Sequence, residues 1–144
     1  MTVLTEEIAL ELLRLGLDVD IPFVYTSIAG NAFSDSLITS VVIPNSVAEI
    51  GDYAFHRSNL GSVEIGMGVT LIGEYAFAEA YITTVIIPDS ITTIPEGAFW
   101  SNYINSVEFG NSVTTIGDEA FEHNYLTSVD IPDSVVTIGF EAFT

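Results

Sequence analysis

The sequence lacks cysteine and lysine altogether, and its only cationic residues are Arg14 and Arg57. Without cysteine there is no disulfide and no thiolate metal site. Twenty acidic residues against two basic ones give a formal net charge of -18. Nucleic acids and anionic membrane surfaces bind through cationic side chains, so neither is expected as a partner. Such a charge favours cations or basic proteins instead.

Long apolar runs and a targeting segment are also missing. No stretch approaches the roughly 18 consecutive apolar residues of a transmembrane helix, so we expect no membrane insertion. The N-terminus has no cationic start, and Glu6, Glu7 and Glu11 interrupt its apolar stretch, unlike a signal peptide. The compartment stays open, because the protein is either intracellular or begins after a signal that has been removed.

What the sequence does contain is a repeat. An Ala-Phe pair recurs every 22 residues, at Ala32-Phe33, Ala54-Phe55, Ala76-Phe77, Ala98-Phe99, Ala120-Phe121 and Ala142-Phe143. A fixed period of this length is typical of solenoids, in which each coil packs against its neighbours. We therefore expect one solenoid domain over residues 1–144, with a capping helix within 1–17 and about five and a half 22-residue repeats over 18–144.

Apolar residues recur at five further positions of the repeat, so every coil presents the same apolar set. In one coil these positions are Ile38, Val41, Ile43, Val47 and Ile50. Each such side chain contributes roughly 1.5–3 kcal/mol when fully buried. A single coil cannot bury them, whereas a stack of coils can.

Each coil predicts a strand, a turn and a short helix. The segment Val41-x-Ile43 is alternating and β-branched, which indicates a strand that ends at Pro44. A polar turn follows, and Gly51–Phe55 is expected to form a helix of one to two turns. Strands of successive coils would pair in parallel, and the return through a helix would make the superhelix right-handed.

The N-terminus predicts a helix over residues 4–15. Thr5 is a suitable N-cap, and Glu6 and Glu7 would lie in the first turn, where the helix dipole favours acidic side chains. One face of this helix is apolar and consists of Leu4, Ile8, Leu12 and Leu15. The first coil of a solenoid has no neighbour on its outer side, so we expect this helix to act as a cap.

The repeated pattern Leu-Thr-Ser-Val-x-Ile-Pro-x-Ser-Val-x-x-Ile-Gly-x-x-Ala-Phe resembles the BspA-like leucine-rich repeat family of bacterial surface proteins. It is almost intact from Leu126 to Gly139 and, with Ile for Leu, from Ile38 to Phe55. The resemblance covers about residues 17–144 and implies an α/β leucine-rich repeat solenoid, with a parallel sheet on the concave face and short helices on the convex side. It also implies adhesion to proteins or cells, an extracellular or cell-surface location, and no shared catalytic residue.

The outward residues of the strands form the candidate binding site on the concave face. Most are acidic or hydroxylated, and they are Ser62, Glu64, Thr84, Ile86, Ser106, Glu108, Ser128 and Asp130. We expect Glu108 and Asp130 on adjacent strands, where two charges about 5 Å apart repel by about 1 kcal/mol in water. This repulsion indicates a cation or a basic partner, unless the carboxylates splay into solvent and are screened.

Three other sets of residues leave alternatives open. Tyr81, Tyr103 and Tyr125 lie one period apart and form either a binding strip or a row that packs over the coil edge. Trp100 is either an exposed anchor or an ordinary surface residue. His56 and His123 occupy different repeat positions without a His-x-x-x-His motif, so we expect no metal site and no cofactor. The serines lack a nearby His-Asp pattern, so we expect no catalytic residue.

The end of the sequence predicts an uncovered coil. Phe140–Thr144 ends the last repeat, and no capping element comes after it, so apolar surface and a strand edge would be exposed. This favours either a piece of a longer array or a homodimer through the C-terminal coil. The leading hypothesis is a non-enzymatic protein-binding or adhesion module that uses its acidic concave face on an unidentified, basic protein ligand. The alternative is a structural stack that self-assembles through its uncapped C-terminal coil.

Overall fold

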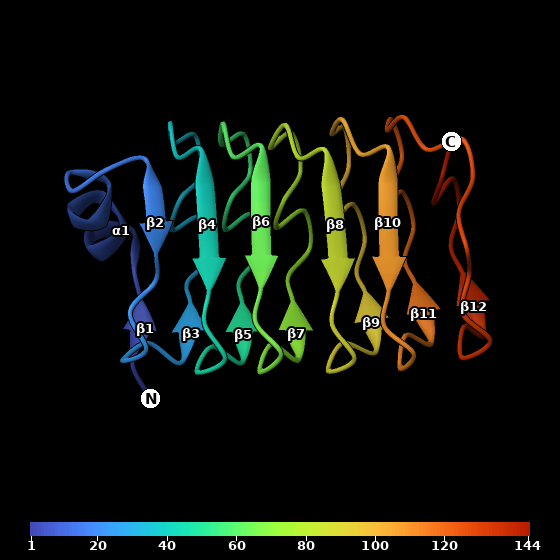
Figure 1. The fold of residues 1–144 in the computed structure, drawn as a ribbon, viewed down its shortest axis with the longest axis horizontal. Helices are drawn as coiled ribbons and strands as arrows, with labels where there is room; N and C mark the ends of the chain where they lie inside the picture. The colour runs from blue at the N-terminus through green and yellow to red at the C-terminus, as the bar shows by residue number, and fades with distance from the viewer.

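The chain winds into coils that stack in a single row, as the computed structural model of residues 1–144 shows (Figure 1). Most coils contribute a longer strand to one side of the row and a two-residue strand to another side. A turn segment that carries the Ala-Phe pair closes each coil. Every strand pairs in parallel with the equivalent strand of a neighbouring coil.

The strands form two rows, which we name the long-strand face and the short-strand face. The long-strand face consists of β2 (Asp18–Asp20), β4 (Ser40–Ile43), β6 (Ser62–Ile65), β8 (Thr84–Ile87) and β10 (Ser106–Phe109). The short-strand face consists of β1 (Val3–Leu4), β3 (Ser27–Ile28), β5 (Glu49–Ile50), β7 (Leu71–Ile72), β9 (Thr93–Ile94), β11 (Thr115–Ile116) and β12 (Thr137–Ile138). Val41 lies opposite Val63, one 22-residue period away, which confirms the predicted parallel pairing of the longer strands.

The short-strand face was not predicted, because the sequence there was interpreted as a polar turn. In β5, β7 and β9 the first residue is exposed and the second is a buried isoleucine. Such a two-residue strand is too short to show alternation in the sequence. It is stabilised by the equivalent strand of the next coil, with which it pairs in parallel so that the buried isoleucines of the two strands lie opposite each other.

The short helices expected at Gly51–Phe55 and its equivalents are not formed; successive turns occupy these segments. Tyr53 has a left-handed backbone with φ of 58°. Its amide donates to the carbonyl of Glu74 in the next coil at 3.0 Å, and the amide of Phe55 donates to that of Ala76. A helix would need these amides for its own carbonyls. Pairing with the next coil therefore replaces the predicted helix.

The predicted N-terminal helix is present as α1 (Glu6–Leu13), shorter than expected at both ends. Thr5 occupies the N-cap position, but its side chain makes no capping hydrogen bond. Leu4 belongs to β1 instead, is fully buried and pairs with β3. The helix lies at the N-terminal end of the row beside β2 (Figure 1). Its function as a cap stays a prediction.

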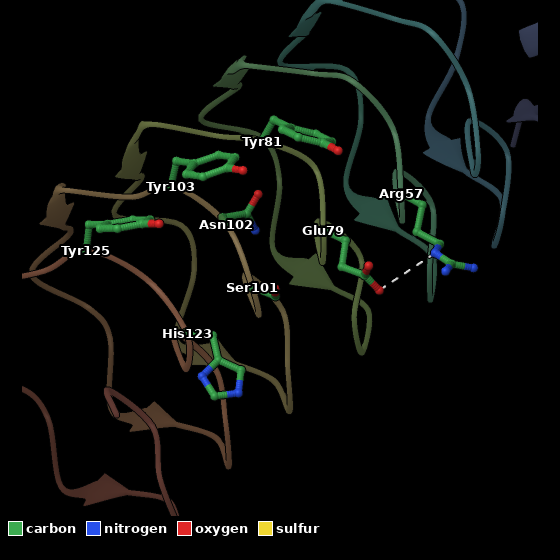
Figure 2. Close-up of a pocket in the computed structure, with 8 residues that line it drawn as sticks. All are labelled: Arg57, Glu79, Tyr81, Ser101, Asn102, Tyr103, His123 and Tyr125. Carbon is green, nitrogen blue, oxygen red and sulfur yellow. Dashed lines mark ion pairs between the residues drawn. The ribbon is translucent and has the colours of Figure 1, made fainter.

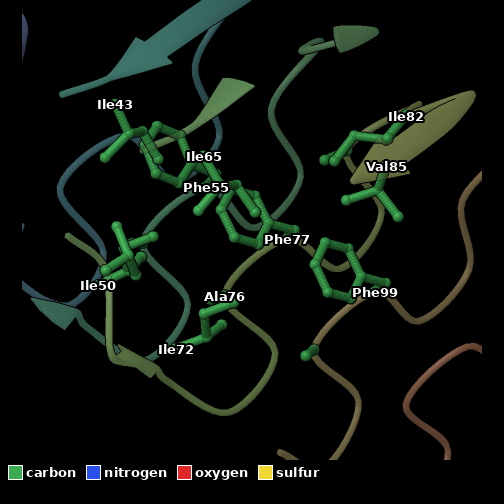
Figure 3. Close-up of a cluster of buried hydrophobic side chains, with 14 of the residues drawn as sticks. Ile43, Ile50, Phe55, Ile65, Ile72, Ala76, Phe77, Ile82, Val85 and Phe99 are labelled. Atoms are coloured by element: carbon green, nitrogen blue, oxygen red, sulfur yellow. The ribbon is translucent and has the colours of Figure 1, made fainter. Parts of the chain in front are cut away.

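The core runs the length of the row and is built around a ladder of phenylalanines. Adjacent rings of the ladder are nearly parallel, with centroids 5.0–5.5 Å apart, and the members are Phe33, Phe55, Phe77, Phe99, Phe121 and Phe143. Figure 3 shows the central rings among buried isoleucines from both faces. Stacked pairs add about 0.5–1.5 kcal/mol to the stabilisation from burial. The ladder therefore stabilises the contact between each coil and the next.

Both strand rows are interrupted at the same junction, between β6 and β8 and between β7 and β9. In neighbouring coils a glycine amide closes the short-strand ladder, as where Gly73 donates to the carbonyl of Ile50 at 2.8 Å. The equivalent residue of β9's coil is Pro95, which has no amide hydrogen to donate to Ile72. The core continues across the junction, because Phe77 and Phe99 still stack at 5.3 Å.

Candidate functional site

The long-strand face carries six of the eight predicted site residues on β6, β8 and β10. Along each strand the side chains alternate, so that Ser62 and Glu64 are exposed while Ile65 is buried. Thr84, Ile86, Ser106 and Glu108 are exposed in the same way. The alternation that was read from the sequence therefore presents these six side chains together on one surface.

The remaining two predicted residues, Ser128 and Asp130, are exposed but lie in a segment that forms no strand. The prediction that Asp130 lies on a strand adjacent to Glu108 is therefore wrong, since β10 pairs only with β8. The reason is weaker packing in the last coil. Ile131 is 37% exposed there, whereas Ile87 at the same repeat position is 1% exposed.

A notch opens on the long-strand face at the interrupted junction between β6 and β8. It has a volume of about 400 Å³ and is lined by Val63, Glu64, Ile65, Thr84 and Ile86. Ile86 points outward from β8 and is 64% exposed, whereas the inward residues Val85 and Ile87 of the same strand are buried. On the next strand Glu108 lies directly opposite Ile86. The notch therefore combines an exposed apolar side chain with the Glu64 carboxylate, and the Glu108 carboxylate lies beside it on the next strand.

At the N-terminal end of this face, hydroxyl groups stabilise one carboxylate. The Ser40 Oγ donates to Asp18 Oδ1 at 2.7 Å, and the Thr39 Oγ1 donates to the same oxygen at 2.9 Å. The bond from Ser40, followed by that from Thr39, lowers the pKa of Asp18 from its ordinary value. One hydroxylated residue of this face, Ser40, therefore hydrogen-bonds to an acidic residue within the same face.

The predicted tyrosine row exists and lies on an edge of the coils, away from the strands. Tyr81 and Tyr103 have ring centroids 5.6 Å apart, and Tyr103 and Tyr125 are 5.7 Å apart, so the rings follow one another like steps (Figure 2). All three are about half exposed. Their hydroxyl groups point in one direction, towards a second row of side chains. Each of these tyrosines therefore packs against a neighbouring tyrosine and is also exposed to solvent, so the structure agrees with both alternatives for the row.

The second row contributes one residue from each of four coils, and all four have left-handed backbones: Arg57, Glu79, Ser101 and His123. Between the two rows lies a trough of about 530 Å³, in which Asn102 forms part of the lining. The side chain of Asn102 is fully used for structure. Its Oδ1 accepts from the amides of Ala80 and Ile82, and its Nδ2 donates to the carbonyl of Phe77. We call this feature the edge trough.

Trp100 and the two histidines do not form the sites considered for them. Trp100 is only partly exposed, and its Nε1 donates to Glu122 Oε2 at 2.9 Å, which contradicts an exposed anchor. His56 lies 3.4 Å from Glu79, and His123 lies 3.5 Å from Glu122. The structure contains no group of three or more histidine, aspartate or glutamate side chains that could hold a metal ion.

Tyr75 is a bridging residue that sequence reasoning missed. Its ring covers Gly97, which has a φ of 57° and at which a Cβ would overlap the ring. The Tyr75 hydroxyl lies 3.1 Å from Glu96 Oε1 and 3.4 Å from Glu119 Oε2. Burial is the largest single cause that raises the pKa of Tyr75 above its ordinary value, followed by the hydrogen bond to Glu96. One feature of the sequence could have indicated this contact. Gly97 occupies a repeat position at which other coils have a larger residue, namely Tyr53, Tyr75 or Glu119.

Comparisons with known proteins support the architecture. The family model of the BspA type leucine-rich repeat region matches residues 26–144 in six copies. Among solved structures, a leucine-rich repeat protein from Eubacterium ventriosum is similar, with a TM-score of 0.68 at 20% identity. A leucine-rich cell surface protein from Faecalibacterium prausnitzii has a TM-score of 0.64 at 28% identity.

These similarities cover most of this chain but less than half of each solved protein. Each match spans 89% of this chain, and it spans 42% of the Eubacterium protein and 45% of the Faecalibacterium protein. No curated protein matches the sequence. None of the helices has the length and apolar character that crossing a bilayer requires.

Proposed function

The chain belongs to the BspA-type leucine-rich repeat family, and from this premise we propose that it is an adhesive, protein-binding module that uses its long-strand face. The family suggests a protein-interaction or surface repeat module, and repeats of this fold are typically non-catalytic scaffolds. An exposed parallel face that offers different side chains in a fixed array suits recognition of a large partner.

The notch around Ile86 is the observation that carries this proposal. Stable interfaces commonly combine an apolar anchor at the centre with a polar rim. Here Ile86 would form the centre, while Glu64 and Glu108 would form the acidic rim. Ser62, Thr84 and Ser106 would add hydroxyl groups beside them. Ser128 and Asp130, on the irregular last coil, would extend the same acidic surface.

We infer that the partner presents basic side chains around an apolar residue. The net charge of -18 would attract such a partner and speed its association at low salt. The Faecalibacterium neighbour is described as a cell surface protein, and this supports a surface location for the present chain. Cleavage by protease added to intact cells would test that location.

Charge reversal on the long-strand face tests the binding proposal. Purified matrix proteins and basic proteins are immobilised, and binding of the wild-type chain is compared with that of Glu64→Lys combined with Glu108→Lys. We expect the double variant to lose about tenfold or more in affinity, since two attractive contacts become repulsive. The matched control is Glu49→Lys with Glu74→Lys, two exposed acidic residues outside this face. Equal binding by both variants would disprove the proposal.

A second candidate function is self-association through the last coil. Val136, Ile138 and Phe140 are exposed apolar side chains on this coil, and Ile138 continues the short-strand ladder. A coil of a second copy would cover them. Light scattering over a range of concentrations tests this candidate. A strict monomer at high concentration would eliminate it.

A further inference from the structure

We propose that the edge trough is a second interaction site, which binds an extended, basic peptide segment of a partner protein. The trough lies between the tyrosine row and the row Arg57, Glu79, Ser101 and His123 (Figure 2). None of its lining residues lies on β6, β8 or β10. This site is therefore separate from the notch on the long-strand face, and each can exist without the other.

The shape of the trough suits a linear partner that runs along the stack of coils. Each row advances by one residue per coil, and the tyrosine rings are spaced 5.6 and 5.7 Å apart. An extended peptide covers roughly 3.3–3.6 Å per residue, so about three or four residues would run past the three rings. A compact small molecule would use only part of such a site.

The way in which the tyrosines are exposed favours a peptide over a glycan. The two faces of the Tyr103 ring are turned towards Tyr81 and Tyr125. Saccharides bind aromatic residues by placing C–H groups on open ring faces, and the central ring offers none. On Tyr103 the ring edge and the hydroxyl remain, and they can exchange hydrogen bonds with peptide groups. Tyrosine, serine and asparagine also dominate the rigid, adaptable paratopes that bind proteins.

The net charge of the whole chain and one oxygen of Glu79 favour a basic segment, while Arg57 in the lining is the one fixed positive charge beside them. Glu79 Oε1 lies 3.4 Å from the His56 Nε2 and 3.7 Å from the Arg57 Nε. Glu79 Oε2 has no protein partner, so it is free to accept from a lysine or arginine of the peptide. The rest of the molecule reinforces this preference, because its net charge of -18 repels acidic segments.

The test selects random peptides displayed on phage against the intact wild-type chain, and then compares variants. The first variant combines Tyr81→Ser, Tyr103→Ser and Tyr125→Ser. The second replaces the same three residues by Phe, which keeps the stack and removes only the hydroxyls. The controls are Tyr53→Ser, at an exposed tyrosine outside the trough, and the charge reversal Glu64→Lys with Glu108→Lys. Circular dichroism establishes that each variant is folded.

Affinities of the selected peptides are read from the fluorescence of Trp100, the single tryptophan, which lies 5.9 Å from His123 at one end of the trough. We expect peptides rich in lysine or arginine that bind the serine variant at least tenfold, and the Phe variant about threefold, more weakly than wild type. Both controls should bind like wild type. A loss caused by Glu79→Gln would agree with the expected contact to its carboxylate.

Three results would overturn the proposal. One is a set of peptides that bind wild type and the serine variant equally, and another is a set without basic enrichment. The third is binding of oligosaccharides on a glycan array, with loss in the serine variant, in place of peptide binding. If the charge reversal on the long-strand face abolished peptide binding while the tyrosine variants did not, the edge trough would be excluded and the first site supported.

Discussion

At the scale of single residues, Gly97 shows how one coil departs from the repeat. It has a φ of 57°, and a Cβ at this residue would overlap the ring of Tyr75. We expect Gly97→Ala to lower the free energy of unfolding by about 1–3 kcal/mol, because it adds both backbone strain and a clash. Thermal unfolding measures the change. Gly61→Ala is the matched control, since Gly61 has a φ of 63° but its Cβ would make only an ordinary contact, 3.5 Å from the Thr39 carbonyl oxygen. Equal losses in both variants would show that the Tyr75 ring gives way.

Asp18 gives a prediction about protonation at the same scale. Hydrogen bonds from Ser40 and Thr39 lower its pKa in the folded state. Ser40→Ala should raise the pKa of Asp18 towards the ordinary value of about 3.9, and NMR titration of the carboxyl resonance measures it. The lowered pKa stabilises the folded chain above the unfolded-state pKa, and this contribution is lost as the pH falls through the folded-state value. An unchanged pKa in the variant would contradict the assigned cause, and Asp20, with no such bond, serves as the internal reference.

At the scale of elements, Pro95 explains why the short-strand ladder is interrupted between β7 and β9. Pro95→Gly restores an amide that can donate to the carbonyl of Ile72, as Gly73 does to Ile50. We expect this amide to be protected from hydrogen exchange like that of Gly117. The stability should change by less than about 1 kcal/mol, since the new hydrogen bond and the lost rigidity of proline oppose each other. Exchange at the rate of an unprotected amide would place the cause of the interruption elsewhere.

The elements also show which parts of the fold were predictable. The longer strands and the phenylalanine ladder followed from the period, because each repeated apolar residue meets its own equivalent in the next coil. The segment Gly51–Phe55 was predicted as a helix from its local composition. Its amides donate to the next coil instead, which is a nonlocal interaction that no local pattern reveals. The short-strand face was missed for the same reason.

The candidate sites were predictable only where they follow the repeat. Six outward residues of the long-strand face were identified because strand alternation places them, whereas Ser128 and Asp130 lost their strand in the weakly packed last coil. The notch depends on an interrupted junction, and the edge trough depends on left-handed residues such as Glu79 and His123. Both features arise where coils differ from the consensus or project side chains from turns.

At the scale of the whole molecule, the charge predicts opposite effects of salt on folding and on binding. With twenty acidic and two basic residues, the folded chain concentrates like charges that the unfolded chain holds further apart. Raising the salt concentration from about 0.01 to 0.5 M shortens the Debye length from about 30 Å to below 8 Å, so the repulsion is screened. We expect the unfolding temperature to rise with salt.

The same screening should weaken the association of a basic partner, chiefly through a slower association rate. Calorimetry of the free chain and binding kinetics in matched buffers measure the two effects. The charge reversal Glu64→Lys with Glu108→Lys should reduce the salt dependence of binding far more than the reversal Glu49→Lys with Glu74→Lys, although the two variants carry the same net charge. If both variants reduced it equally, attraction would depend on total charge alone, and the long-strand face would have no special part in recognition.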